Sequence, residues 1–247
     1  MKPNIFILGP SGTGKSTSLR NLNPTEVAIL NTELKALPFR NSSKFKLNLP
    51  IEDMSMFHKM FDKVLAGANT KIAIIESFTS LVEHQLRASK KMFPLSTQGY
   101  DRWGNYKDEI GDILLKSKTT NKYIVFTGID QVIEGANGVE ERCIAVQGDW
   151  KKKVEKEFVI ILYTVMFTNE KGQPEYKFIT NKQEGFENVP AKSPMGMFPL
   201  VMPNDLNLII EYIEKYDNND TEEVKTVTTE KVTETSPEEE MQTASKQ

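Results

Sequence analysis

The sequence predicts an α/β protein in which helices flank a largely parallel sheet, with an antiparallel hairpin late in the chain. In the first half, apolar runs of strand length alternate with amphipathic stretches of helix length, which is typical of a parallel sheet covered by helices. A glycine-rich segment joins the first apolar run to the first helical stretch. Near the end, β-type runs at 158–168 and 175–180 flank a turn-forming Asn-Glu-Lys-Gly-Gln-Pro, which indicates a β-hairpin.

The glycine-rich segment, residues 9–16, has the spacing of a phosphate-binding P-loop. It lies between the apolar run 4–8 and a helical start at 16–20, which is the context that the motif needs. Glycines let backbone N–H groups curl around an anion, and a helix N-terminus adds favourable charge. Because a chance glycine turn rarely has this full context, we predict a nucleoside triphosphate site. Its binding residues are Gly9, Pro10, Ser11, Gly12, Thr13, Gly14, Lys15, Ser16 and Thr17.

Two side chains of this segment have expected roles, and a third lies further along the chain. Lys15 can reach the β- and γ-phosphates, and Ser16 can offer its hydroxyl to magnesium. The apolar run 72–75 ends in Glu76, as a Walker B strand ends in the acid that holds Mg²⁺, usually through water. The usual residue is Asp, and an ordinary strand that ends in an exposed acid is the alternative.

The other elements follow from periodicity. Residues 51–66, 78–93, 103–118 and 204–216 each place apolar side chains on one helical face, and 150–157 indicates a short basic helix. Strands are expected at 27–30, 44–48, 123–127 and 143–146, with irregular chain at 93–99, 128–141 and 185–203.

Composition restricts the class of protein. The 247 residues are 38% hydrophobic, enough for a substantial core, and no apolar run is long enough to span a bilayer. The first ten residues already form a strand and loop, so we expect no signal peptide. The single cysteine, Cys143, excludes an internal disulfide and suits a reducing cytoplasm. With only His58 and His84 and no clustered thiols, a structural zinc site is not expected.

Charge divides the chain into two parts. Residues 217–247 hold nine acidic and three basic residues, a net charge of −6, which leaves +3 on residues 1–216. The segment is also poor in large apolar residues, so we predict a globular domain over 1–216 and a disordered acidic tail over 217–247. A mildly basic body permits nucleic-acid binding without arguing strongly for it.

The motifs together resemble the phage-encoded core-only RecA-like ATPases, the ATPase branch of single-strand annealing proteins. The resemblance covers roughly residues 3–216. It rests on the P-loop and on an ordered series of weaker pieces: Asn-Thr-Glu at 31–33, Ile-Ile-Glu-Ser-Phe-Thr-Ser-Leu at 74–81, Gln-Gly-Asp-Trp-Lys at 147–151 leading to Phe158, and Ala-Lys-Ser-Pro at 191–194. It implies a RecA-like P-loop NTPase fold, in which a further strand lies between the P-loop strand and the Walker B strand. It also implies ATP and Mg²⁺ as cofactors, single-stranded DNA as partner, and self-assembly into an oligomer or filament.

By this resemblance, Glu33 would be the general base, and Thr127 would lie where a sensor residue contacts the γ-phosphate. Asn31 and Glu76 both stand where the family has Asp, so turnover is expected to be slow if Glu76 holds magnesium poorly. Lys182 and Lys192 are candidates for reaching the phosphate of a neighbouring protomer, although most lysines are simply solvated.

The resemblance also places two DNA-contacting loops. The first covers residues 93–103, with Tyr100, Arg102 and Trp103, and aromatic and cationic side chains together suit single strands. The spacing of Trp103 and Tyr106 to Ile110 equally suits a helix core. The second loop covers 128–142 and offers Arg142, but its four acidic residues oppose DNA: Asp130, Glu134, Glu140 and Glu141.

The leading hypothesis is therefore a cytoplasmic ATPase, in the host cytoplasm if phage-encoded, that binds single-stranded DNA and promotes annealing or strand exchange. The acidic tail would bind a single-strand-binding or replication protein. A P-loop nucleotide or small-molecule kinase is the first alternative, and the lack of clustered arginines weighs against it. A nucleotide-gated loader with little turnover is the second.

Overall fold

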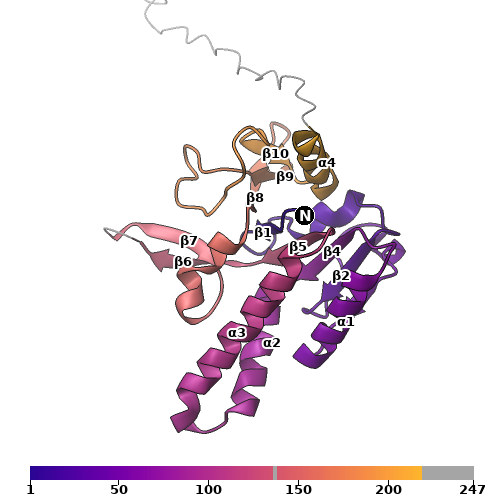
Figure 1. Ribbon diagram of the computed structural model, residues 1–247. Helices are drawn as coiled ribbons and strands as arrows, with labels where there is room; N and C mark the ends of the chain where they lie inside the picture. Colours follow the sequence, from indigo (N-terminus) through magenta and orange to yellow (C-terminus); the bar gives the residue numbers. More distant parts are fainter. Residues whose placement is uncertain (136–137, 219–247) are drawn as a thin grey trace, which may run out of the picture.

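The computed structural model describes residues 1–135 and 138–218, and its centre is an eight-stranded sheet (Figure 1). The strand order is β10-β9-β8-β1-β5-β4-β2-β3. The six strands from β8 to β3 are parallel, and β9 and β10 join the β8 edge antiparallel. The predicted fold class is thereby confirmed, including the late hairpin of β8 and β9. The strands are β1 Ile5–Leu8, β2 Val27–Asn31, β3 Asn48–Pro50, β4 Ile72–Glu76, β5 Tyr123–Gly128, β8 Ile160–Thr168, β9 Pro174–Ile179 and β10 Val201–Pro203.

The strand order gives the sheet its functional edge. β5 lies between β1 and β4, the strands that precede the P-loop and end in Glu76, as the RecA-like resemblance predicts. Because these strands are parallel, their carboxyl ends meet at one edge, where ligands bind in open α/β sheets. Asn31, the last residue of β2, pairs in register with Glu76, so the segment that follows β2 and carries Glu33 lies beside the end of β4.

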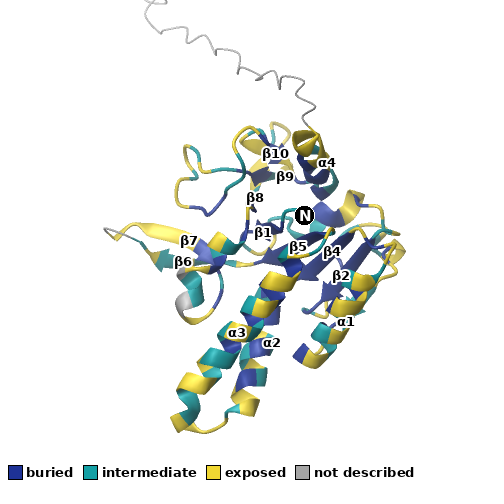
Figure 2. Ribbon diagram, in the orientation of Figure 1, coloured by how far each residue is buried: buried dark blue, intermediate teal, exposed yellow. Residues whose placement is uncertain are grey.

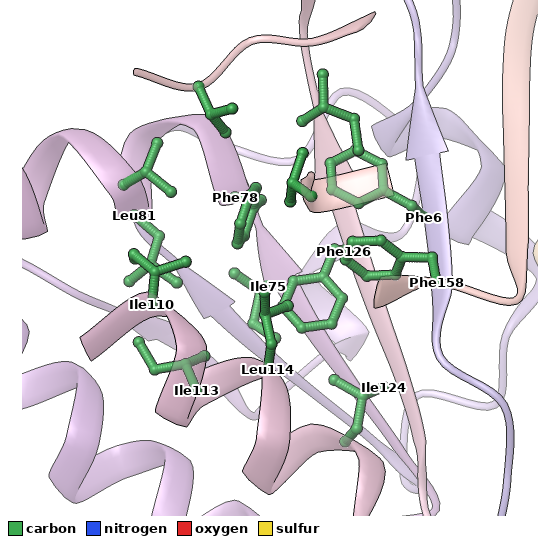
Figure 3. Close-up of a cluster of buried hydrophobic side chains, with 14 of the residues drawn as sticks. Phe6, Ile75, Phe78, Leu81, Ile110, Ile113, Leu114, Ile124, Phe126 and Phe158 are labelled. Atoms are coloured by element: carbon green, nitrogen blue, oxygen red, sulfur yellow. The ribbon is translucent and has the colours of Figure 1, made fainter. Parts of the chain in front are cut away.

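Helices cover both faces of the sheet, and the sheet separates the hydrophobic core into two clusters (Figure 2). The strands are buried on both faces, and alternate side chains enter alternate clusters. Phe6 packs with the α2 and α3 side, whereas Ile5 and Ile7 pack with the α4 side. At the centre of the first cluster, the Phe6 ring meets Phe158 edge-on at 4.9 Å between centroids (Figure 3). The helices are α1 Met54–Ala66, α2 Phe78–Met92, α3 Gly99–Lys118 and α4 Leu206–Asp217.

Two hairpins extend from this body (Figure 1). The helices α2 and α3 run side by side away from the sheet and join at a tip formed by residues 93–98. The strands β6 Asp130–Glu134 and β7 Glu140–Ile144 form a separate antiparallel ribbon. Among the described residues, no helix is both long and apolar enough to cross a membrane.

Several sequence-based boundaries were wrong. A strand was expected at 44–48, but Ser42–Lys44 form a 3-10 turn after the left-handed Asn41, and the strand begins at Asn48. The segment 128–141 was expected to be irregular and contains β6, with β7 replacing the strand expected at 143–146. The expected helix at 150–157 is two 3-10 segments, Gly148–Lys152 and Val154–Glu157. The predicted tail beyond residue 218 lies outside the described residues.

Candidate nucleotide-binding site

The P-loop encloses one side of a cavity of ≈ 460 Å³ at the carboxyl edge of the sheet. Ser11, Gly12, Gly14, Lys15, Ser16 and Thr17 all line it. Gly12 and Gly14 have φ of 81° and 94°, the left-handed region that glycine adopts without strain. The loop therefore already has the curled backbone that a phosphate chain requires, and the cavity suits a small polar ligand.

The loop is also tied to the neighbouring strand β8. The Thr13 hydroxyl lies 2.5 Å from the Thr164 hydroxyl, which also donates to the Leu8 carbonyl at 3.2 Å. A Cβ on Gly9 would lie 2.3 Å from Thr164 Oγ1, so only glycine fits there. Gly9, Pro10 and Thr13 thus shape the loop from behind, whereas the six lining residues face the cavity.

Lys15 folds back onto its own loop. Its Nζ donates to the Gly9 carbonyl at 2.9 Å and to the Pro10 carbonyl at 2.7 Å. Burial lowers its pKa below the ordinary lysine value, while the negative charges of Glu76, Asp130 and Glu33 act in the opposite direction. Neutral carbonyls are weaker partners for an ammonium than phosphate oxygens, so a phosphate chain in the cavity can replace them.

Glu76 lies beside Ser16, the first residue of the 3-10 helix Ser16–Asn21 that follows the P-loop. Its Oε1 accepts from Ser16 Oγ at 2.5 Å and its Oε2 accepts from Thr127 Oγ1 at 2.7 Å. Burial raises its pKa, and the two hydroxyl donors oppose that rise. A hydroxyl and a carboxylate together are hard oxygen donors that suit Mg²⁺ bound with a nucleotide. Within the described residues, no three His, Cys, Asp or Glu side chains are grouped closely enough to hold a metal ion by themselves.

Glu33 faces the same cavity from the segment after β2. Its Oε1 accepts from Ser77 Oγ at 2.8 Å, and its Oε2 accepts from Lys35 Nζ at 2.9 Å. Partial burial acts to raise its pKa, but the hydrogen bonds from Lys35 and Ser77 outweigh burial, and the pKa lies below the usual glutamate value. Asn31 donates to the Lys35 carbonyl at 2.7 Å, so the residue that replaces Asp shapes the turn beyond Glu33.

Thr127 was expected at a sensor position, and the structure places it behind Glu76. Its side chain is completely buried, and its hydroxyl donates to the Glu76 carboxylate. Lys35 and Tyr176 also line the cavity but were not predicted. The Tyr176 ring lies against Gly14, where an added Cβ would be 3.1 Å away. The hairpin signal located β9, yet no local pattern shows that its tyrosine reaches the P-loop.

The predicted DNA-contact residues are not gathered in one place. Tyr100 is 90% exposed at the start of α3, and Trp103 is 38% exposed. Arg102 is engaged in holding the tip, since it donates to the carbonyls of Phe93 and Leu95. Arg142 pairs with Asp130 at 2.6 Å across the β6–β7 ribbon. Tyr106 is buried in the core, as the alternative interpretation of its spacing predicts.

The two lysines expected to act on a neighbouring protomer lie near a second cavity of ≈ 570 Å³, beside the β6–β7 ribbon. Lys182 lines this cavity together with Glu141 and Glu155. Lys192 donates instead to the Glu155 carbonyl at 2.7 Å, and burial lowers its pKa. Neither lysine lines the nucleotide cavity of its own chain.

The strand order, the P-loop and the acid on β4 define a P-loop NTPase of the α/β class. A family model described as an AAA domain matches residues 1–195, and the chain belongs to that family. Among solved structures, the chain is similar to the KaiC-like protein PH0186 from the hyperthermophilic archaeon Pyrococcus horikoshii OT3, with 11% identity and a TM-score of 0.44. That similarity covers 72% of this chain and 77% of the archaeal one. No curated protein matches the chain.

Proposed function

We propose that the protein binds and hydrolyses ATP, with Glu33 as general base. The observation that carries this proposal is the meeting of Lys15, Ser16, Glu76 and Glu33 around one cavity at the carboxyl edge of the sheet. In the reaction, a water oxygen attacks the γ-phosphorus, the bond to the β–γ bridging oxygen breaks, and ADP leaves with the electron pair. Glu33 takes the proton of the water, and Lys15 binds the phosphate oxygens. Ser16 and Glu76 would hold Mg²⁺, which supplies charge neutralisation when it is bound.

Glu33→Gln tests the assignment of the base. The substitution keeps size and removes basicity, so ATP affinity is expected to stay and hydrolysis to fall by about 100-fold or more. Steady-state ATPase assays and calorimetric binding on the same samples give both numbers. If binding and turnover fall together, Glu33 supports the structure of the site and does not accept the proton.

We further propose that the protein binds single-stranded DNA and promotes annealing or strand exchange, as phage core-only RecA-like ATPases do. The supporting observation is the tip of the α2–α3 hairpin, where Tyr100 and the exposed Lys90 and Lys91 surround a chain reversal. Exposed aromatic rings stack on bases, and lysines neutralise phosphates. Assembly into an oligomer would bring Lys182 and Lys192 toward a neighbour's phosphates, and the acidic tail would bind a single-strand-binding or replication protein.

Fluorescence anisotropy with a labelled oligonucleotide tests DNA binding, measured with ATP, with ADP and without nucleotide across a salt series. We expect ATP-dependent affinity that falls steeply with salt, and Tyr100→Ala should weaken it by about tenfold. Tyr216→Ala is the matched control, because Tyr216 is an exposed tyrosine on α4, a helix that lies far from the tip in Figure 1. Absence of binding at low salt in every nucleotide state would favour a kinase or a loader with little turnover.

A further inference from the structure

The two oxygens of the Glu33 carboxylate have different surroundings. Oε1 accepts from Ser77, the N-cap residue of α2, which is 2% exposed and held in place by that helix. Oε2 accepts from Lys35, whose side chain is 76% exposed, so this donor can move away into solvent or toward a ligand in the cavity. Oε2 is therefore the oxygen that could accept a proton from an attacking water, but only after the Lys35 ammonium group has moved away from it.

The pair between Lys35 and Glu33 is easily exchanged. Exposed ion pairs contribute little net free energy, because solvent screens them and both side chains lose freedom. The backbone of Lys35 is held independently of its ammonium group, since its carbonyl accepts from Asn31 Nδ2 at 2.7 Å. The ammonium can therefore change partner while the base of the side chain stays at the rim of the cavity that Lys15 and Ser16 also line.

We propose that Lys35 is a second phosphate-binding cation, which leaves Glu33 for the γ-phosphate when a triphosphate occupies the cavity. This inference rests on the proposed ATP site. A terminal phosphate carries more negative charge than a carboxylate and offers several acceptor oxygens, so it competes well for the ammonium. The transfer frees Oε2 of Glu33 to accept the proton of a water. A diphosphate lacks that terminal group at the same place, so Lys35 distinguishes ATP from ADP and makes the base available only with ATP.

The test compares affinities for ADP and for a non-hydrolysable β,γ-imido analogue of ATP, measured by calorimetry with Mg²⁺ on the full chain. Lys35→Met keeps length and removes the charge, and it should lose about tenfold in affinity for the analogue while ADP affinity stays within about twofold. Lys35→Arg keeps the cation and should retain the preference for the analogue. Lys71→Met is the matched control, since Lys71 is 69% exposed and pairs with Glu26 away from the cavity.

A second measurement separates this role from a structural one. In Lys35→Met, the acidic limb of the pH profile of kcat/KM should move to higher pH, because Glu33 of the free protein has lost its neighbouring cation. The acidic limb of kcat should move much less, because Lys35 has already left Glu33 in the ATP complex. A lysine that stayed paired with Glu33 throughout would shift both limbs equally. Equal losses for ADP and the analogue, or no loss for either, would overturn the inference while leaving the ATP site intact. If the wild-type protein binds neither nucleotide, the proposed function fails and the inference falls with it.

Discussion

Glu33 and Glu76 line the same cavity, yet their pKa values move in opposite directions. Glu76 is 8% exposed, and burial raises its pKa despite the hydroxyls of Ser16 and Thr127. Glu33 is less buried, and hydrogen bonds from Lys35 and Ser77 lower its pKa. Groups shifted apart in this way are typical of sites where carboxylates have different tasks. The two shifts also change the stability of the fold with pH, and they do so in opposite directions.

Glu76→Gln is expected to stabilise the fold at neutral and alkaline pH. The pKa of Glu76 is higher in the folded state than the unfolded value of about 4.3. At any pH between these two values, the folded state therefore holds more of this proton than the unfolded state does. Stability therefore falls over the interval, and the buried charge remains a cost above it. The melting temperature of Glu76→Gln should exceed that of the wild type at pH 8 by roughly 2–4 °C. The gain should vanish near pH 4, where both side chains are neutral.

Glu33→Gln gives the opposite sign and serves as the comparison. A lowered folded-state pKa contributes stability that is present above the unfolded pKa and is lost as pH falls through the folded one. This variant should melt below the wild type at pH 8 and match it at low pH. A Glu76→Gln protein that melts lower than the wild type at pH 8 would show that the hydrogen bonds of this carboxylate outweigh its burial.

At the scale of elements, the P-loop is shaped by β8 as well as by its own glycines. The Thr164 side chain contacts the Thr13 hydroxyl and the Leu8 carbonyl, and it lies directly against Gly9. One side chain of β8 therefore holds both the end of β1 and the loop that follows it. Because β8 follows β1 by about 150 residues, the loop takes its conformation only when the sheet is assembled. The phosphate site therefore depends on tertiary packing, and the P-loop sequence does not form it alone.

Gly9→Ala should consequently destabilise the whole fold. The added Cβ would lie 2.3 Å from Thr164 Oγ1 and 2.9 Å from the Thr164 carbonyl oxygen, and backbone cannot move aside cheaply. We expect a loss of about 2–4 kcal/mol in the free energy of unfolding, measured by urea denaturation. Gly172→Ala is the control, because Gly172 also has a positive φ but open space around its Cα, and it should cost about 1–2 kcal/mol. Equal losses would mean that the contact with Thr164 is easily relieved.

For the whole molecule, the sequence predicted the central strands of the sheet and the late hairpin, but it misplaced the edge strand β3 and missed the edge strand β10 and most of the β6–β7 ribbon. Buried parallel strands such as β1 and β4 are continuous apolar runs, which no other element imitates at that length. The β6–β7 ribbon carries four acids and an arginine among its ten residues, and only Cys143 and Ile144 are buried, so its sequence resembles a polar loop. Its pairing depends on contacts from elsewhere, including the N–H of Arg142 bonded to the Asn188 carbonyl.

The same division holds for the candidate site. The P-loop and the acid of β4 are local patterns, so their residues could be named before the fold was known. The pairing of Glu33 with Ser77 needs β2 and β4 to be neighbours, which only the sheet order supplies. Thr164 and Tyr176 come from strands that no nucleotide-binding motif marks, and they meet the P-loop only through packing.

Removing the acidic tail should leave the folded body unchanged. The last helix, α4, ends at Asp217 and buries Leu206, Ile209, Ile210 and Ile213, so a chain that ends at Asn218 keeps this packing. The removed sequence has no periodic apolar face to offset the entropy of ordering it. Thermal melting and ATP binding should match the full chain, and DNA affinity should rise as negative charge is lost. A melting temperature lowered by many degrees would show that the tail packs on the body.

The most direct test of the central claim is a nucleotide titration of Lys15→Ala beside the wild type. The Lys15 ammonium group donates to two carbonyls of its own loop, and we propose that it donates to phosphate oxygens instead when ATP is bound. Losing such charge-assisted contacts should weaken ATP binding by about 100-fold, with the melting temperature of the free protein little changed. Wild-type affinity for ATP in the Lys15→Ala protein would contradict the assignment of this cavity as the nucleotide site.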